Sequence, residues 1–218
     1  MVLSWENIDS LEDFKITYLL YQEGKNINQI SKIRNMKIDD VNRDIIKYKQ
    51  LLNQTKHKNK TIIDILLEED KDSRTDIINS LNENELNNVK KLLYKRILVE
   101  KNVDDLIILL WICGELKDCR LLDIIHTCSK HPHGGVRRMS YSAMGKIGSD
   151  KSIDYLHKGL IDAKPQVRQY SAKSLCKIGN EITLKKLKNL INNPNEKEYV
   201  KRAFLEAIDI LENIKNKN

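Results

Sequence analysis

The segment Val136–Gly148 reads VRRMSYSAMGKIG, and the segment Val167–Gly179, thirty-one residues further on, reads VRQYSAKSLCKIG. Weaker copies of the same pattern occur upstream in Leu106–Leu116 and downstream in Val200–Leu211. A fixed period in this range is typical of a helical hairpin that is copied and stacked, because each copy must bury its apolar face against the next. The repeat therefore predicts an all-α chain whose C-terminal half is an α-α superhelix.

Each copy is expected to contain two helices. Apolar residues at three- and four-residue steps mark a first helix after Val167 and a second helix over Leu184–Ile191. Gly148 and Gly179 follow the last apolar residue of their first helices, where a left-handed C-terminal cap is expected. Small residues in the first helices should let neighbouring helices approach closely. These residues are Ala143, Ala172, Ser174 and Ala207.

This pattern, Pro-x-Val-Arg followed by small residues and then Leu/Met-x-Lys-Ile-Gly, resembles HEAT repeats, in particular the short variety first noted in phycobilisome lyases. The resemblance covers residues 104–214 and implies a right-handed HEAT-repeat solenoid. It also implies an internal ladder in which an acid before a first helix bonds an arginine, as Asp162 would bond Arg168. Arg137 and Lys201 stand at the place of Arg168 in the neighbouring copies, and the resemblance extends the ladder to them.

The resemblance further implies that the second helices line the concave face of the stack. The lysines on these helices are Lys158, Lys185, Lys186 and Lys188. A face with several cations suits phosphates and acidic peptides equally well. A macromolecular partner is therefore expected, and no cofactor is.

The first sixty residues predict three helices: Leu11–Glu23, Asn28–Arg34 and a third that opens at Asp39. Their order, together with the segment Gly24–Ile33, resembles the helix-turn-helix domains of bacterial sigma factors and response regulators. The resemblance implies that the third helix enters the major groove of DNA. The residues that would contact DNA are then Lys25, Lys32, Lys37, Asn42, Arg43, Lys47 and Lys49.

Two interpretations of this N-terminal unit stay open. Asn42 and Arg43 are suited to reading adenine and guanine, and the lysines would lie near phosphates. Against DNA, Asp39, Asp40 and Asp44 place three carboxylates on the helix that would approach a polyanion. Small three-helix units with this pattern often bind proteins instead. DNA contact and protein docking are therefore equal alternatives.

The chain is expected to divide into three parts. Residues 1–56 form the three-helix unit, residues 57–103 a divergent helical unit that caps the stack, and residues 104–218 the repeats. The polar stretch Lys56–Lys60 marks the first boundary. Residues 57–103 keep helical periodicity but lack the repeat phrase, which is typical of a terminal unit in a repeat stack.

One group of residues has the composition of a metal site. Its members are Cys119, His126, Cys128, His131 and His133. Zinc prefers four such ligands in a tetrahedron, but the usual pair of cysteines two residues apart is absent here. We therefore expect a buried cysteine and an exposed histidine-rich loop, with no bound metal.

No sequence motif of the common catalytic classes occurs, so we expect no enzyme activity. Glu115 near Trp111 resembles the carboxylate-plus-aromatic sites of HEAT-like DNA alkylation glycosylases, in which the carboxylate would stabilise a cationic sugar. A core tryptophan beside a solvated glutamate is the commoner arrangement. The glycosylase is therefore a minor alternative.

Charge and composition bear on the partner, the compartment and the source of the protein. The net charge is +7, and residues 61–100 are net acidic while the flanking regions are net basic. The sequence contains no run of eighteen apolar residues, so it predicts no membrane-spanning helix. Four cysteines without paired spacing favour a reducing compartment, hence the cytoplasm, and the many Lys, Ile and Asn residues are typical of a low-GC bacterium. We expect a cytoplasmic, non-enzymatic adaptor that binds a macromolecular partner. In one version the N-terminal unit contacts DNA and the repeats recruit a partner; in the alternative the chain is purely a protein-binding scaffold.

Overall fold

The computed structural model describes residues 3–58 and 60–215, with side chains at all of them except 7, 53–58 and 215. The described residues form helices, turns and loops without a strand among them, so the predicted all-α class is confirmed. The chain divides into two compact units, unit 1 (Met1–Thr61) and unit 2 (Ile62–Asn218).

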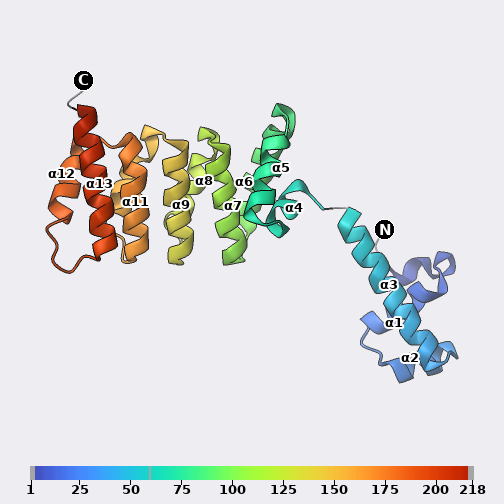
Figure 1. Cartoon of the computed structure of the whole chain (residues 1–218). Coiled ribbons are helices and arrows are strands. Elements are labelled where there is room, and N and C mark those ends of the chain that lie inside the picture. Colours follow the sequence, from blue (N-terminus) through green and yellow to red (C-terminus); the bar gives the residue numbers. More distant parts are fainter. Residues whose placement is uncertain (1–2, 59, 216–218) are drawn as a thin grey trace. The chain divides into compact units, whose positions relative to one another are not determined.

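Unit 1 contains one 3-10 helix and three α-helices: η1 (Trp5–Ser10), α1 (Asp13–Gln22), α2 (Ile27–Arg34) and α3 (Ile38–Lys58). The α-helices pack against one another and share a small core (Figure 1). Leu20, Ile30, Val41 and Ile45 form this core. The third helix α3 continues past residue 56, where the sequence analysis placed the end of the first domain; the side chains at that point lie outside the described residues.

Local hydrogen bonds define the ends of α2. The Asn26 side chain accepts from the N–H of Gln29 at 2.9 Å, and the Gln29 side chain accepts from the N–H of Asn26 at 3.0 Å. This capping box satisfies two N–H groups that the helix itself leaves free. Asn35 ends the helix at a left-handed φ of 49°. Ile30 is the buried residue of α2, whereas Ile33 is 56% exposed.

Unit 2 is a stack of paired helices. The first helices lie side by side in one row: α7 (Val103–Leu116), α9 (Gly134–Ile147), α11 (Pro165–Ile178) and α13 (Glu198–Lys215) (Figure 1). The second helices between them are α8 (Leu122–Cys128), α10 (Ile153–Gly159) and α12 (Glu181–Leu190), with the 3-10 turns η2 (Cys119–Leu121) and η3 (Asp150–Ser152) before the first two. The leading helices are α4 (Ile62–Glu68), α5 (Lys71–Ser80) and α6 (Glu83–Val99).

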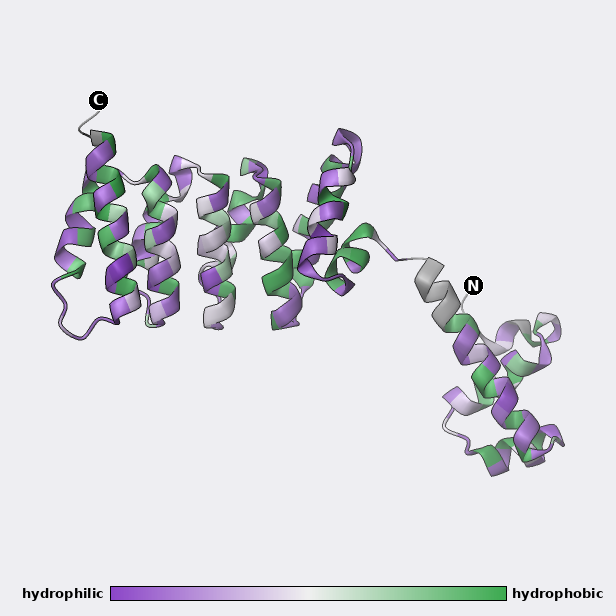
Figure 2. Cartoon of the chain, in the orientation of Figure 1, coloured by the Kyte–Doolittle hydropathy of each residue, from purple (hydrophilic) through white to green (hydrophobic). Residues whose placement is uncertain are grey.

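A single hydrophobic core runs through unit 2 from Ile63 to Leu211. Val136 and Val167, which open the two best copies of the repeat, are both fully buried in it. Figure 2 shows that the helices of unit 2 carry both hydrophobic and hydrophilic residues along their length. Because the apolar side of each hairpin is covered by the next, the copies form one continuous spine, as the repeat predicts.

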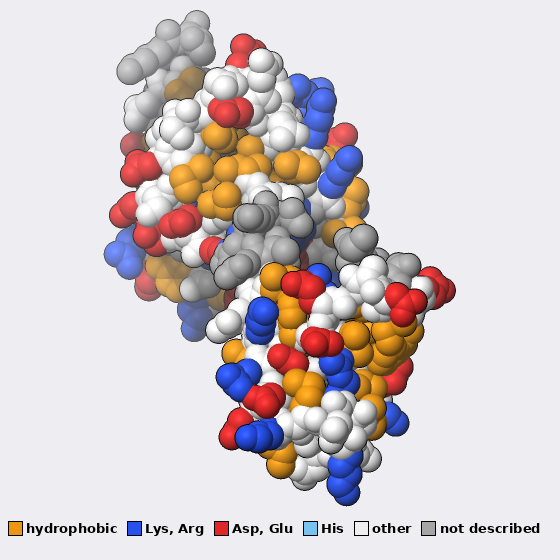
Figure 3. Space-filling model, turned by 90° about the vertical axis from the view of Figure 1, so that its right-hand side faces the viewer, with side chains coloured by type: hydrophobic (Ala, Val, Ile, Leu, Met, Phe, Trp, Pro, Cys, Tyr) orange, Lys and Arg blue, Asp and Glu red, His pale blue; other side chains and the backbone are white. Residues whose placement is uncertain are grey.

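The end of unit 2 formed by the leading helices exposes apolar side chains. Ile65, Leu98 and Val99 are 37%, 60% and 70% exposed. The space-filling view of Figure 3 is taken from this side and shows hydrophobic side chains gathered on the face of unit 2. Since terminal units of repeat stacks usually present polar groups, this end is more apolar than a terminal cap normally is.

The first helices approach each other most closely where small residues meet. A Cβ atom at Gly114 would lie 3.1 Å from the Cα atom of Ala143 in α9, and one at Gly145 would lie 2.8 Å from the Cα atom of Ser174 in α11. Gly114 and Gly145 are thirty-one residues apart, so the contact recurs with the period of the repeat. Ala143 and Ser174 therefore lie at the close contacts that the sequence predicts for small residues.

The two glycines that end first helices differ in their backbone. Gly148 has a φ of 71°, which confirms the predicted left-handed cap, and Lys117 takes the same conformation at the equivalent place after α7. The prediction is wrong for Gly179, whose φ is −65°. A Cβ atom there would lie 2.7 Å from both the Leu175 carbonyl oxygen and the Leu211 Cδ1 atom. Close packing, and not a positive φ, therefore requires glycine at residue 179.

Candidate functional site

Two arginines join consecutive repeats through part-buried ion pairs. Arg137 in the first turn of α9 donates from Nε and Nη2 to the Asp162 carboxylate at 2.7 and 2.8 Å. Arg168 in α11 donates in the same way to Glu196 at 2.7 and 2.6 Å. Each arginine also donates from Nη1 to a main-chain carbonyl of the loop before its own helix. These bidentate bonds fix each loop to the loop of the next copy.

The expected pairing of Asp162 with Arg168 is wrong in register. The Asp162 carboxylate bonds the arginine of the preceding first helix, Arg137, and Arg168 reaches forward to Glu196. Only the main-chain carbonyl of Asp162 accepts from Arg168. Glu196 was missed because the loop before α13 is two residues longer than its counterpart, which shifts the acid out of alignment.

The ladder is limited to these two rungs among the described residues. The loop before α9 carries His131 where an acid would stand, and α7 has Leu106 at the place of the arginine, so there is no cation to neutralise. Lys201, at the equivalent place in α13, pairs with Glu198 of its own helix at 3.5 Å. The predicted Lys201 rung therefore stays within one helix.

The carboxylates of the ladder are held in their charged form. Burial would raise the pKa of Glu196, but hydrogen bonds from Arg168 and from the N–H of Lys197 hold it below its usual value. Burial and Arg137 act on the pKa of Asp162 in the same opposing ways, with the same result. Their contribution to stability is present above the ordinary carboxyl pKa of about 4 and is lost as the pH falls below it. The ladder thus stabilises the stack at neutral pH.

A second set of contacts repeats with the same period between the second helices. Nε2 of His126 in α8 lies 2.9 Å from the hydroxyl of Ser152, and Nε2 of His157 in α10 lies 2.8 Å from the hydroxyl of Thr183 in α12. Both histidines and both hydroxyl residues are thirty-one positions apart. The His126 ring also stacks on Tyr155 with centroids 3.8 Å apart. The equal spacing of the two pairs is visible in the sequence and is the signal from which these contacts could have been predicted.

Because of these two histidines, we expect the folded protein to lose stability in mild acid. Burial lowers the pKa of His126, and burial together with the charge of Lys186 lowers the pKa of His157. Because the two histidines bind protons more readily in the unfolded chain than in the folded chain, the free energy of unfolding should fall as the pH drops below about 6.5. The slope is at most about 1.4 kcal/mol per pH unit for each histidine. Urea denaturation on either side of this pH measures it.

Two variants separate this effect from general acid sensitivity. His126→Gln keeps a group that can bond Ser152 but cannot take up a proton, so its slope in mild acid should be shallower than that of the unmodified chain. His133→Gln alters an exposed histidine and serves as the matched control. An unchanged slope in His126→Gln would contradict the assignment.

The sulfur and nitrogen atoms of the metal-like cluster do not converge. Cys128 and His126 are buried in α8, whereas Cys119 is exposed. In the loop, Nδ1 of His131 accepts from the N–H of His133 at 3.1 Å. Burial raises the pKa of the Cys128 thiol to about 11, which disfavours the thiolate that binds metals. Within the part of the chain that the structure describes, no group of three or more such ligands is placed to hold a metal ion.

Glu115 and Trp111 lie in α7 but are both engaged by cations. The Glu115 carboxylate pairs with Lys146 of α9. The Lys146 ammonium also lies 5.4 Å from the centroid of Trp111, and the guanidinium of Arg74 lies 5.4 Å from the same ring. This arrangement ties α5, α7 and α9 together, and it leaves Glu115 neutralised by a neighbouring ammonium.

The predicted DNA-contacting residues of unit 1 fall into two groups. The first group is exposed on α2 and the turns beside it: Lys25, Lys32 and Lys37. The second group lies on α3, where Arg43 forms an ion pair with Asp40 of the same helix and Asn42 is half-buried. The Lys47 ammonium lies 4.2 Å from the ring centroid of Phe14, and that of Lys49 lies over a tyrosine ring. On α3, therefore, the three cations are exposed and each contacts a neighbouring side chain.

A groove separates the second helices α10 and α12. Two adjoining hollows of about 190 and 380 Å³ form it and share His157, Ile161 and Lys186. Ile161 is 71% exposed and Ile182, on the opposite wall, is 58% exposed. Lys158 lines the same wall as Ile161. The groove therefore combines exposed aliphatic side chains with cations.

The four lysines predicted for this surface differ in their surroundings. Lys158 and Lys186 line the groove, and no carboxylate among the described residues forms an ion pair with either. Lys185 is exposed on α12 but lines neither hollow, and Lys188 pairs with Glu212 of α13. Two of the four lysines are therefore available to an anionic ligand in the groove.

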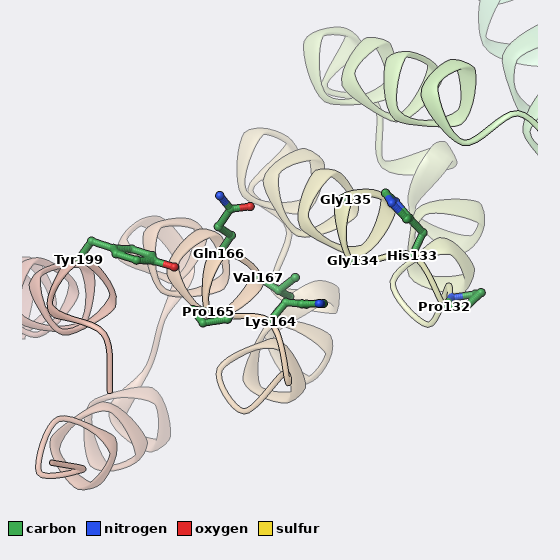
Figure 4. A pocket seen from close by; sticks show the side chains of 9 residues that line it. All are labelled: Pro132, His133, Gly134, Gly135, Lys164, Pro165, Gln166, Val167 and Tyr199. Carbon is green, nitrogen blue, oxygen red and sulfur yellow. The ribbon is translucent and has the colours of Figure 1, made fainter. Parts of the chain in front are cut away.

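A separate hollow of about 590 Å³ lies where α9 and α11 begin (Figure 4). Its lining residues are Pro132, His133, Gly134, Gly135, Lys164, Pro165, Gln166, Val167 and Tyr199. Figure 4 shows Lys164 extending toward the start of α9, with Tyr199 on the opposite side. These side chains include no nucleophile with a base beside it, so the hollow offers contact surface and no evident chemistry.

No family model matches the chain, and no curated protein matches it. Among the described residues, no helix combines the length and the apolar character that crossing a bilayer requires.

Proposed function

We propose that the protein is a non-enzymatic adaptor of the HEAT-repeat type whose second helices bind a protein partner. The observation that carries this proposal is the groove between α10 and α12. Exposed aliphatic residues lie there among lysines that have no carboxylate partner among the described residues. Protein interfaces combine such an apolar centre with a polar rim, and exposed apolar patches commonly mark interaction sites.

The HEAT assignment is supported by contacts that recur every thirty-one residues. The glycine contacts between first helices and the histidine–hydroxyl pairs between second helices both follow this period. The arginines of the ladder follow it as well. Stacks of this kind serve as extended surfaces for partners, and we assign the second helices to the binding face.

The enzymatic alternative is weaker than the adaptor. A glycosylase would need a carboxylate free to face a cationic sugar, and Glu115 is instead paired with Lys146.

DNA binding is the second candidate function, since Lys25, Lys32 and Lys37 are exposed together around α2. On α3, Arg43 and Lys47 are exposed as well, but Arg43 forms an ion pair with Asp40, and the Lys47 ammonium lies over a phenylalanine ring.

The proposal is tested by the nature of the captured partner. We expect the full chain, purified from its native cells, to retain a defined protein after nuclease treatment, and to give no retardation of random duplex DNA at low salt. A retarded complex that disappears with Lys25→Glu and Lys32→Glu while the chain stays folded would favour DNA binding. Loss of the captured partner on nuclease treatment would contradict the adaptor.

A further inference from the structure

We propose that the groove between α10 and α12 binds an acidic amphipathic segment of a protein, with aliphatic side chains in the hollow and carboxylates on Lys158 and Lys186. The proposal rests on the proposed adaptor function and adds the chemistry of the partner. It is carried by the shape of the groove, by its charge and by the chemistry of its lining.

The apolar part of the groove has a buried floor and exposed walls. Leu160 and Leu190 line the smaller hollow, and Leu160 is fully buried. Ile161 and Ile182 stand exposed on the two walls. A hollow of about 190 Å³ has room for an aliphatic side chain. Covering the isoleucines would remove apolar surface from water, which favours binding.

The charge of the groove selects an anionic partner. Lys158 and Lys186 line it, and Asp154 is the one acid among its described lining residues. A carboxylate-bearing segment is therefore attracted, whereas a basic segment is repelled and would leave unpaired cations against one another.

The lining favours a protein over a nucleic acid. Proteins that bind single strands stack bases on exposed aromatic rings. No phenylalanine, tyrosine or tryptophan is among the described residues that line the two hollows. Tyr155 of α10 is stacked on His126 and has the Lys158 ammonium 5.6 Å from its centroid. The exposed isoleucines of the walls have no role in phosphate contact but suit the leucine or isoleucine residues of an amphipathic helix.

The groove is also held in place before any partner arrives. His157, which lines both hollows, lies 2.8 Å from the hydroxyl of Thr183 and so links α10 to α12. Thr183 in turn accepts from the N–H of Asn180 in the capping box that starts α12. A partner that binds a surface already ordered loses less entropy than one that must order it.

The test uses the full chain and a labelled peptide of about 18 residues with leucines at helical spacing and glutamates elsewhere. Fluorescence anisotropy at fixed ionic strength should show saturable binding. The double variants Lys158→Glu with Lys186→Glu, and Ile161→Ser with Ile182→Ser, should each weaken binding about tenfold or more, a loss of about 1.4 kcal/mol. Peptides with lysine in place of glutamate, or alanine in place of leucine, should not bind.

The matched control carries the same change of charge on another face. Lys173 and Lys177 are exposed on α11 and do not line the groove. The double variant Lys173→Glu with Lys177→Glu should leave peptide affinity within about twofold, less than 0.5 kcal/mol. Equal weakening by this control, no saturable binding of the acidic peptide, or tighter binding of duplex DNA at the same residues would each overturn the proposal.

Failure here is distinguishable from failure of the adaptor function. A nuclease-resistant protein partner that remains bound to Lys158→Glu with Lys186→Glu would keep the adaptor and reject the groove as its site. Loss of that partner from this variant, and not from the Lys173→Glu with Lys177→Glu control, supports both proposals.

Discussion

Replacing Arg168 with methionine is expected to destabilise unit 2 by about 3 to 5 kcal/mol, the range found when one partner of a buried ion pair is removed. The Glu196 side chain is only 5% exposed, and without Arg168 its carboxylate would keep the hydrogen bond from the N–H of Lys197 and the more distant charge of Lys201. Removing the arginine also frees the carbonyl of Asp162 from its bond to Nη1. Urea denaturation at neutral pH measures the loss.

The ion-pair explanation is checked by removing the partner as well. The double variant Arg168→Met with Glu196→Gln leaves no unpaired charge buried, so it should recover much of the lost stability. Lys201→Met disrupts a pair whose glutamate, Glu198, is 81% exposed, and it should have a far smaller effect. If the double variant were as unstable as Arg168→Met alone, packing of the arginine stem, and not the charge of Glu196, would be its main contribution.

Replacing Gly145 with alanine should also destabilise unit 2, by about 2 to 3 kcal/mol. Helix propensity alone predicts the opposite sign, since alanine is favoured over glycine by roughly 1 kcal/mol inside a helix. The new methyl group would lie 2.5 Å from Cβ and 2.8 Å from Cα of Ser174, so α9 and α11 must move apart. The sign of the change in the free energy of unfolding therefore decides between propensity and packing.

A second-site change tests the contact itself. Ser174→Gly removes the hydroxyl and Cβ that the new methyl would strike, but it also removes the bond from the Ser174 hydroxyl to the Tyr141 carbonyl at 2.8 Å. Gly145→Ala combined with Ser174→Gly should therefore be less destabilised than the sum of the two single changes. Strict additivity would show that the two positions do not share a contact and would contradict the argument.

The repeat phrase was sufficient to predict how unit 2 is built. Val136 and Val167 open two copies of the same pattern of apolar and small residues, and both are fully buried in one core. Such periodicity is a local property, because residues three and four apart fall on one face of a helix whatever lies around it. The helix-forming segments of unit 1 were readable for the same reason, although Ile33 shows that periodicity does not tell how much of a short helix is covered.

The candidate site was only partly readable. Sequence placed Lys158, Lys185, Lys186 and Lys188 on one kind of surface, but their partners come from other helices. Lys188 is paired by Glu212, twenty-four residues away, and only Lys158 and Lys186 line the groove. The exposure of Ile161 and Ile182 could not be predicted, because a helical stripe gives no sign of where a neighbouring helix ends.

The sequence by itself determined the helices, their pairing into hairpins and their stacking, because these follow from the spacing of apolar and small residues along the chain. Only the tertiary structure decided which partner each charged or titratable side chain takes. Arg168 meets Glu196 in place of Asp162, and His126 meets Ser152 in place of a loop cluster. Ion pairs and hydrogen bonds form over about 3 Å, a distance set by how whole hairpins are rotated and offset, which no local pattern encodes.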